Sequence, residues 1–546
     1  MSTMTRLSFA LTFVVTPPPT LTAQESHDHA SAGERLGRVT FPISCVAPAR
    51  QRFEHAVAYL HSFWYEKATT AFGDVVATDS TCAMAYWGRA MALWHLLWTP
   101  PGPTDLAAGL TAAEHGVALA RTPRERAYLE AIATYYRDYE HTDPKARLLA
   151  YAGKMAAVQR GNPDDREAAI FYGLALIAVG QANPTDTTFA YQKRADSILE
   201  PLYKLEPQHP GLAHYLIHAN DVPPLATHGL YAARHYAAIA PDVPHAQHMP
   251  SHTFTLLGLW DEDIVANTRS AAAAHQFEQA QHLNALWDQR GHAWDYLVYA
   301  DLQLGKDRAA KAIVDEAAGV TAVYPAGSLI NEYALAAIPA RYALERGQWP
   351  EAAQLPVRPA PEWRAAEAIT HFARALGAAR SGDSVGLSRE IAALGQIAEG
   401  LRQAGGPQTY WAEQVKNQLR VVAAWDALVV SHDTGAALGQ AKAAADVEDV
   451  TAKHPVTPGP VLPARELYGD LLVATGHYAE AADAYVTSLK NAPRRGRSLF
   501  GLARAAELAG DAATARSRYQ DYLKLMENAD GERPELALAR RAIRPP

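Results

Sequence analysis

A spacing of 34 residues recurs along the chain and constrains its fold more than any other feature. It is clearest in two triplets near the C-terminus: Gly476, Ala481 and Tyr485, and then Gly510, Ala515 and Tyr519. A fixed period of this length is typical of small stacked units that cover the hydrophobic faces of their neighbours. The glycine suits a tight turn, the alanine a close helix contact, and the aromatic ring the gap between units. We therefore expect a solenoid instead of one globular core.

Weaker copies of the pattern cover most of the chain. They comprise Ala68 with Phe72, Pro163, Pro207, Gly258 with Trp260, Gly305 with Ala310, and Gly347 with Ala352. The pattern resembles the tetratricopeptide repeat (TPR) family, whose units are helix-turn-helix hairpins. The resemblance implies an all-α fold, a right-handed TPR-like α-solenoid of roughly ten stacked helix pairs. Alanine-rich stretches and the lack of sustained Val/Ile/Thr alternation in the sequence favour the same fold class.

Two proline-rich stretches, near 356–363 and 454–463, interrupt the helical pattern. The expected segments are a signal peptide (1–23), an N-terminal solenoid with a histidine-rich groove (24–355), degenerate helical repeats (356–453) and a C-terminal repeat pair (464–546). Arg6, a short apolar run from Leu7 to Val15 and small residues ending at Ala23 predict the signal peptide. We therefore expect export to the periplasm or the extracellular space. No stretch reaches the ~18 apolar residues of a transmembrane helix, so we expect no membrane span.

Charge and cysteine content limit the partners and the redox chemistry. The formal net charge is -8 and the pI about 6.3. This balance provides no basic stripe for phosphates and disfavours a nucleic-acid partner. The two cysteines, Cys45 and Cys82, could form one disulfide in an exported protein, worth roughly 4 kcal/mol by loop entropy. Two buried free thiols are the alternative.

Two histidine pairs repeat in the 34-residue register, His214 with His218 and then His248 with His252. A step of four residues places both members of a pair on one helix face. Between His209 and His292 lie 11 of the 22 histidines of the chain. In the family that the chain resembles, the first helix of each unit lines a concave groove. That frame predicts eight side chains in one groove: His214, His218, Asp221, His245, His248, His252, His292 and Asp295.

Imidazoles with a nearby carboxylate are suitable ligands for Zn, Cu, Ni or Fe. Asp221, Asp295 and Tyr299 could orient the rings through hydrogen bonds. The alternative is a set of histidines that bond across helices or line a peptide site. Neither pair is the HExxH of metalloproteases, and the sequence has no GxSxG elbow or Walker loop. The reaction class, and whether the protein is an enzyme, stay open.

Aromatic residues form a second candidate site. The segment YWGRAMALWHLLW contains Trp87, Arg89, Trp94, His95 and Trp98, which could bind a ligand ring or a carboxylate. A tryptophan stripe at helical spacing is also typical of the core between repeats.

Two functions follow from these patterns. The first is an exported TPR scaffold that binds a protein, peptide or small ligand in its groove. The alternative is a metalloprotein, a metal carrier or a metal-dependent enzyme, with its site in the same groove.

Overall fold

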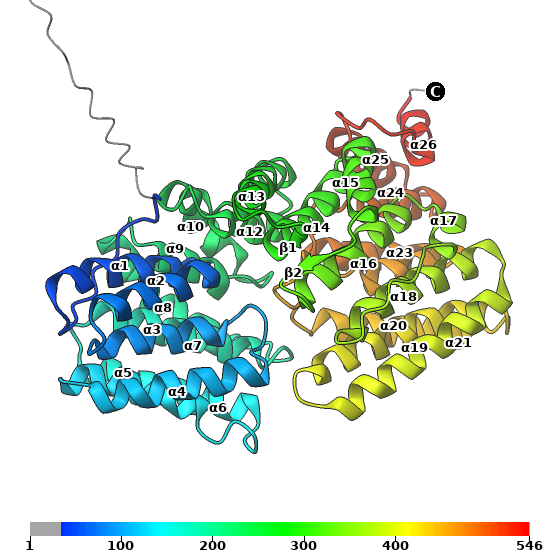
Figure 1. The fold of residues 1–546 in the computed structure, drawn as a ribbon. Helices are drawn as coiled ribbons and strands as arrows, with labels where there is room; N and C mark the ends of the chain where they lie inside the picture. The colour runs from blue at the N-terminus through cyan, green and yellow to red at the C-terminus, as the bar shows by residue number, and fades with distance from the viewer. Residues whose placement is uncertain (1–33, 545–546) are drawn as a thin grey trace, which may run out of the picture. The chain divides into compact units, whose positions relative to one another are not determined.

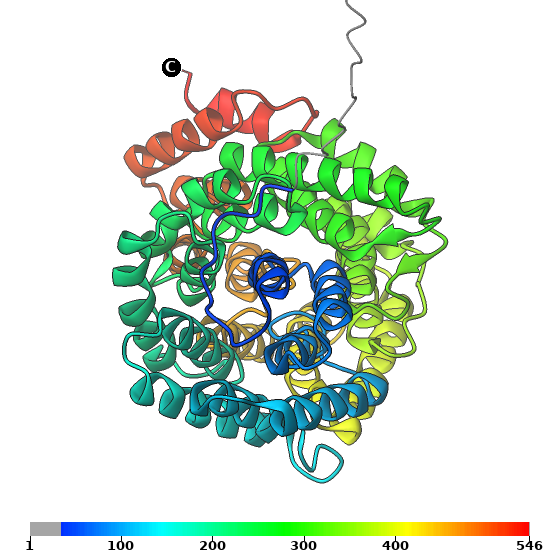
Figure 2. The ribbon, with the colours of Figure 1, turned by 60° about the vertical axis from the view of Figure 1, so that its left-hand side comes forward.

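The computed structural model describes residues 34–544, so the predicted signal peptide lies outside the described residues. From Arg35 onward the chain forms one compact unit of helical hairpins, shown in Figure 1. Consecutive helices pack side by side along the chain, as Figure 2 shows from a second direction. The predicted fold class, an all-α TPR-like solenoid, is confirmed.

The first eight helices precede the histidine-rich segment. They are α1 (Ala47–His61), α2 (Tyr65–Thr78), α3 (Ala83–Trp94), α4 (Pro103–Leu119), α5 (Pro123–Tyr136), α6 (Pro144–Gly161), α7 (Arg166–Gln181) and α8 (Ala190–Leu205). The histidine-rich segment and the hairpin after it contain α9 (Pro210–Ala219), α10 (Ala226–Ile239), α11 (Pro244–His248), α12 (Pro250–Leu257), α13 (Trp260–Ala280), β1 (Leu286–Trp287), α14 (Asp288–Gln303), α15 (Asp307–Ala318) and β2 (Val323–Tyr324). The two short strands pair in parallel, with Leu286 opposite Val323.

The remaining helices complete the solenoid. They are α16 (Leu329–Glu345), α17 (Trp349–Ala353), α18 (Arg364–Ser381), α19 (Ser384–Ala404), α20 (Gln408–Val429), α21 (Thr434–Asp449), α22 (Ala464–Ala474), α23 (Tyr478–Asn491), α24 (Gly496–Leu508), α25 (Ala512–Leu525) and α26 (Pro534–Ala542). Both proline-rich stretches lie in the non-helical connections before α18 and α22. Among the described residues, no helix combines the length and the apolar character that a membrane span requires.

The C-terminal repeats show why the 34-residue pattern produces this fold. Gly476 and Gly510 both have φ of 84°, a left-handed turn that glycine adopts without strain. The ring of Tyr485 lies between Gly469 and Gly501, where an added Cβ would come within 2.8 and 2.4 Å of it. The small residues therefore make room for the aromatic ring that fills the gap between hairpins.

A break in the helix does not disturb the second histidine pair. Pro250 lacks a backbone N–H, so α11 ends at His248 and α12 begins at Pro250. Met249, between them, keeps right-handed helical angles (φ -51°, ψ -34°). The chain thus continues in the same direction, and His248 and His252 stay on one face.

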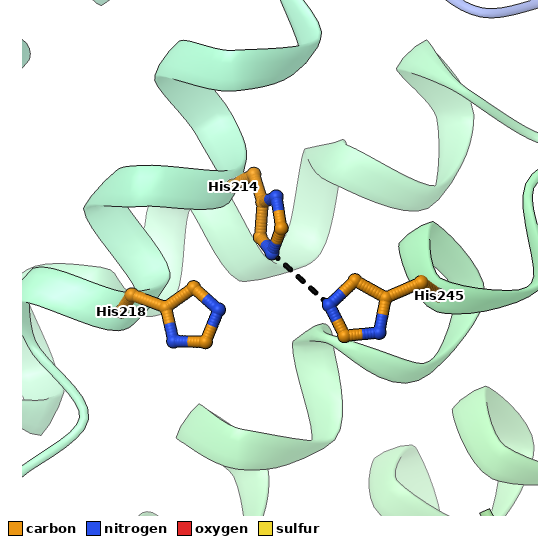
Figure 3. A group of neighbouring side chains, drawn as sticks. All are labelled: His214, His218 and His245. Carbon is orange, nitrogen blue, oxygen red and sulfur yellow. Dashed lines mark hydrogen bonds between the residues drawn. The ribbon is translucent and has the colours of Figure 1, made fainter. Parts of the chain in front are cut away.

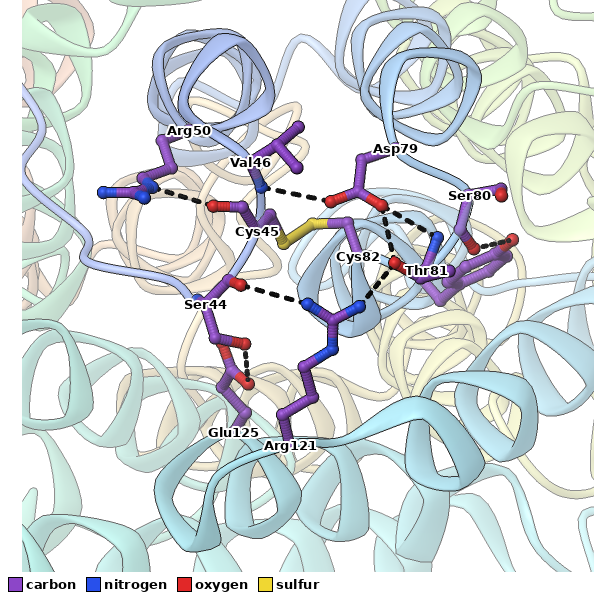
Figure 4. Close-up of a disulfide and its surroundings, with 11 residues drawn as sticks. Ser44, Cys45, Val46, Arg50, Asp79, Ser80, Thr81, Cys82, Arg121 and Glu125 are labelled. Carbon is purple, nitrogen blue, oxygen red and sulfur yellow. Dashed lines mark hydrogen bonds between the residues drawn. A yellow bond between two sulfur atoms is a disulfide. The ribbon is translucent and has the colours of Figure 1, made fainter.

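A disulfide joins Cys45, in the segment before α1, to Cys82 at the N-cap of α3. Figure 4 shows the polar contacts around it. Arg50 donates a hydrogen bond to the Cys45 carbonyl (2.8 Å), and the Val46 N–H donates to Asp79 (3.1 Å). Of the two alternatives for the cysteines, the structure has the bridge, which fixes the start of the solenoid to its second hairpin.

Candidate metal centre

Six histidines from three consecutive repeats meet in the interior of the protein. They form two groups: the first trio is His214, His218 and His245, and the second trio is His248, His252 and His292. In each trio, one ligand nitrogen per ring lies within 4.8 Å of the others. None of the six residues is more than 4% exposed. The sequence pattern predicted that these six rings would lie close together, but not that they would divide into two buried trios.

The first helices of the repeats position these side chains. Helix α9 carries His214 and His218, and α11 carries His245 and His248. His252 lies on α12 and His292 on α14. The trios adjoin each other, since the ring centroids of His218 and His252 are 5.8 Å apart. Equivalent positions on neighbouring first helices therefore converge, as stacking of repeats requires.

In the second trio, hydrogen bonds determine which nitrogens carry protons. Nδ1 of His248 lies 2.6 Å from Oδ1 of Asn267. The amide nitrogen of Asn267 donates both of its hydrogen bonds to Asp263, one to the carboxylate (2.7 Å) and one to the backbone carbonyl (3.1 Å). Asn267 thus presents an acceptor to His248, whose Nδ1 donates. Nδ1 of His252 likewise donates to Oδ2 of Asp221 (2.9 Å).

This assignment leaves the Nε2 atoms of His248 and His252 as unprotonated acceptors, and they face each other at 3.0 Å. Two lone pairs at this separation repel unless an added proton or a metal ion lies between them. Metal–nitrogen bonds of about 2.1 Å at angles of 90–109° separate two ligand nitrogens by about 3.0–3.4 Å. The observed separation lies in that range.

In the first trio, drawn in Figure 3, a hydrogen bond assigns the proton of one ring only. Nδ1 of His214 donates to the carbonyl of His61 (2.6 Å), and its Nε2 lies 3.2 Å from Nε2 of His245. Several other ring nitrogens are buried without a hydrogen-bond partner, namely both of His218 and the Nδ1 atoms of His245 and His292. Unpaired buried polar atoms are costly, so their accumulation in one place favours a site for an ion or a small polar molecule such as water.

Burial also keeps the rings neutral, the form that binds a metal. Loss of solvation lowers the pKa of His214 to about 3 and that of His248 to about 4. The pKa values of the other four are lowered well below the ordinary value, again chiefly by burial. For His252 the neighbouring Lys453 adds to the effect.

The trios are covered and do not line an open groove, contrary to the sequence-based expectation. Phe63, in the turn after α1, packs its ring against His214, His218 and His245 at centroid distances of 4.3–5.6 Å. On another side, Tyr296 lies 3.4 Å from His252 Nε2 and donates to the Thr457 carbonyl in the loop before α22 (3.2 Å). Segments distant in the sequence close the site.

Of the three predicted partners of the rings, Asp221 lies beside the second trio, whereas Asp295 and Tyr299 bind arginines. Asp221 contacts the second trio through His252, and the same oxygen, Oδ2, accepts from Lys453 (3.0 Å). Asp295 instead pairs with the buried Arg341 (2.8 Å), and Tyr299 accepts from Arg495 (3.1 Å). Asp295 and Tyr299 therefore support the packing of α14, and neither contacts a trio through these bonds.

A third buried cluster lies behind the first trio. Nε2 of His61 and Nε2 of His209 lie 3.1 and 2.9 Å from the two carboxylate oxygens of Glu167. Burial alone would raise the pKa of Glu167, but the two histidines lower it to about 2. Nδ1 of His61 also contacts the Tyr215 hydroxyl (2.9 Å). Since these rings are already bonded, the cluster supports His61, whose carbonyl orients His214.

The aromatic candidates have different surroundings. Trp87 is fully buried among Phe41, Tyr128 and Phe171, and Trp94 stacks on Tyr135 at 3.8 Å. These two rings form core between repeats. Arg89 is half-buried on the same helix, and His95 packs beside Tyr65. Trp98 lies edge-on to His245 and His292, so it borders both trios.

Sequence reasoning missed several residues that complete the site. Phe63 and Lys453 come from segments far from the histidines, and no spacing connects them to the repeats. Asn267 lies on the second helix of its hairpin, 19 residues after His248. A polar residue at a buried position of α13 is the one signal that could have found it.

The comparisons with known proteins found similarities to solved structures only. No family model matches the sequence, and the search of curated proteins found no match. Among solved structures, the chain is similar to human IFIT1 in its dimer with PPP-AAAA (10% identity, 87% of this chain and 90% of that chain, TM-score 0.37). It is also similar to yeast Tom70 (11%, 91% and 95%, TM-score 0.26) and to the TPR domain of P58(IPK) (11%, 85% and 99%, TM-score 0.20). At such low identities, function has to be inferred from the chain's own side chains.

Proposed function

We propose that this protein is a metalloprotein whose two histidine trios each bind a transition-metal ion. The contact between Nε2 of His248 and Nε2 of His252 is the observation that carries the proposal. Both Nδ1 protons are already donated, to Asn267 and Asp221, so the 3.0 Å contact needs either an added proton or a metal ion between the two Nε2 atoms. Burial lowers the pKa of both rings and so disfavours the added proton. In the first trio the support is the accumulation of buried ring nitrogens without a hydrogen-bond partner, both of His218 and Nδ1 of His245.

The donor set suits Zn, Cu, Ni or Fe, because all six ligands are neutral imidazoles of borderline softness. Three protein ligands per ion leave a coordination position for water or substrate, as catalytic sites do. The acceptors on Nδ1 of His214, His248 and His252 are the outer partners that metal-binding histidines ordinarily have. A metal-dependent enzyme and a metal carrier share this site, and capture of a protein or peptide in a groove stays a prediction.

Elemental analysis of protein purified without an affinity tag or chelator tests the proposal. We expect up to two metal ions per chain in the wild type and about one in the His248→Ala/His252→Ala variant. A His228→Ala/His235→Ala variant is the matched control, because both of these histidines are exposed on α10. Its metal content should equal that of the wild type.

The contrary result is equally clear. The proposal is wrong if the wild type contains no metal and its unfolding temperature does not rise with added Zn²⁺, Cu²⁺, Ni²⁺ or Fe²⁺. It is also wrong if the His248/His252 variant keeps both ions. Far-UV circular dichroism of each variant checks that the helices are intact.

We also propose that the protein is exported, with cleavage after Ala23. The disulfide between Cys45 and Cys82 supports an oxidising compartment. N-terminal sequencing of the mature protein should begin at Gln24, and an intact N-terminus in the expressing cell would contradict export.

A further inference from the structure

A cavity of about 250 Å³ lies next to the second trio. It is bounded by α18, α20 and the loop before α22, and Leu256, Phe372 and Trp411 contribute to its mainly apolar wall. Its mainly apolar lining is typical of a site for an organic molecule, and its volume, just below the usual range of about 300–1,000 Å³, limits that molecule to a small one. None of the six histidines lines it, but Asp221 and Lys453 do.

Asp221 connects the cavity to the trio. Its Oδ2 accepts from both His252 and Lys453, while its Oδ1 is buried with no hydrogen-bond partner. The residue is only 8% exposed, so solvent has little access to this oxygen, and a hydrogen-bond donor in the cavity would stabilise it. Oε1 of Gln418, also in the cavity wall, is a second buried acceptor without a partner.

The charges around the cavity are compensated. Lys453 pairs with Asp221 at 3.0 Å, and Arg465 pairs with Asp449 at 2.8 Å. Burial raises the pKa of Glu448 to about 8, so this carboxyl group is largely protonated at neutral pH. An ion would find no uncompensated partner here, whereas a neutral molecule with an N–H or O–H group would satisfy the unpaired acceptors.

We infer that this cavity binds a small, neutral, largely apolar molecule that donates a hydrogen bond to Asp221 Oδ1, as a phenol or an aromatic amine would. Donation to Asp221 weakens the bond that its carboxylate accepts from His252. The ligand therefore acts on the second trio through one side chain. This last step rests on the proposed metal centre, whereas the binding step does not.

The probe is N-phenyl-1-naphthylamine, a neutral aromatic amine whose fluorescence rises in apolar surroundings, titrated into metal-free protein. We expect saturable binding at one site per chain. Ala365→Phe, at a buried position of the cavity wall, should abolish it. Asp221→Leu, which removes the acceptor of the probe's single N–H, should weaken it about tenfold, the effect of one hydrogen bond. Gln403→Leu, on the exposed face of α19, should bind like the wild type.

Absence of saturable binding, or equal binding by wild type, Ala365→Phe and Asp221→Leu, would overturn the inference. A second titration uses Co²⁺-loaded protein, where the probe should shift the visible absorption band of the ion. An unshifted band with the probe bound would overturn the contact with Asp221. Failure of Co²⁺ to bind would count against the metal centre, while the metal-free titration still decides the cavity.

Discussion

Asn267→Leu should weaken metal binding at the second trio without removing a metal ligand. The amide is fully buried and makes four hydrogen bonds. Its oxygen accepts from His248 Nδ1 (2.6 Å) and Ser251 (3.5 Å), and its nitrogen donates to the carboxylate and carbonyl of Asp263 (2.7 and 3.1 Å). Leucine has a similar volume but no acceptor. It therefore leaves the His248 proton unpaired and the ring without its orientation.

The size of the effect follows from the bond that is lost. Removing the outer partner of a metal-binding histidine lowers affinity about 10- to 100-fold. That ratio corresponds to about 1.4–2.7 kcal/mol, the range for leaving one buried polar group unpaired. The two bonds to Asp263 affect stability instead, and their loss should lower the free energy of unfolding by about 1–3 kcal/mol.

The assay is competition for Zn²⁺ against a chromophoric chelator at fixed pH. A His214→Ala/His245→Ala background isolates the second trio from the first. Thr268→Ala, exposed on the same helix, is the control and should leave the affinity unchanged. An affinity within twofold of the background protein for Asn267→Leu would refute the role assigned to the amide.

Three further predictions concern stability. Burial opposes ionisation of Glu466, but Arg495 and Arg497 outweigh it and lower the pKa to about 2 from the ordinary 4.5. Because the folded-state pKa is lowered, this contribution is complete above about pH 4.5 and decreases as the pH falls towards 2. Urea unfolding should show the advantage of wild type over Glu466→Gln shrinking by about 2 kcal/mol between pH 7 and pH 3; a constant difference would contradict the shift. Phe63→Ala removes a ring that is 1% exposed and should lower the free energy of unfolding by about 3–5 kcal/mol in the same assay. A decrease below about 1 kcal/mol would mean that the ring does not pack on the first trio. Replacing Cys45 and Cys82 by serine opens a loop with a sequence separation of 37. The free energy of unfolding should fall by about 4 kcal/mol, because the unfolded chain gains the entropy of the open loop. An unchanged thermal unfolding temperature would show that the bond does not constrain the unfolded chain.

Much of the candidate site could be predicted because it follows the repeat. His214, His218, His248 and His252 occupy matching positions, and stacking brings matching positions together. The frame also brought His245 and His292 to the same region, although in buried trios and not along an open groove. It misplaced Asp295, because the frame gives the direction of a side chain but not its partner. Arg341 lies on the next first helix and binds that carboxylate.

The sequence by itself determined the helical hairpins, their stacking and the meeting of the histidines. These properties depend on local turns and on a short period, which each segment encodes alone. Only the tertiary structure decided that the trios are buried. Phe63 and the loop that contains Lys453 and Thr457 cover them from positions far away in the sequence. Such contacts form between segments that are many repeats apart, and a pattern that repeats every 34 residues carries no information about which distant segments meet.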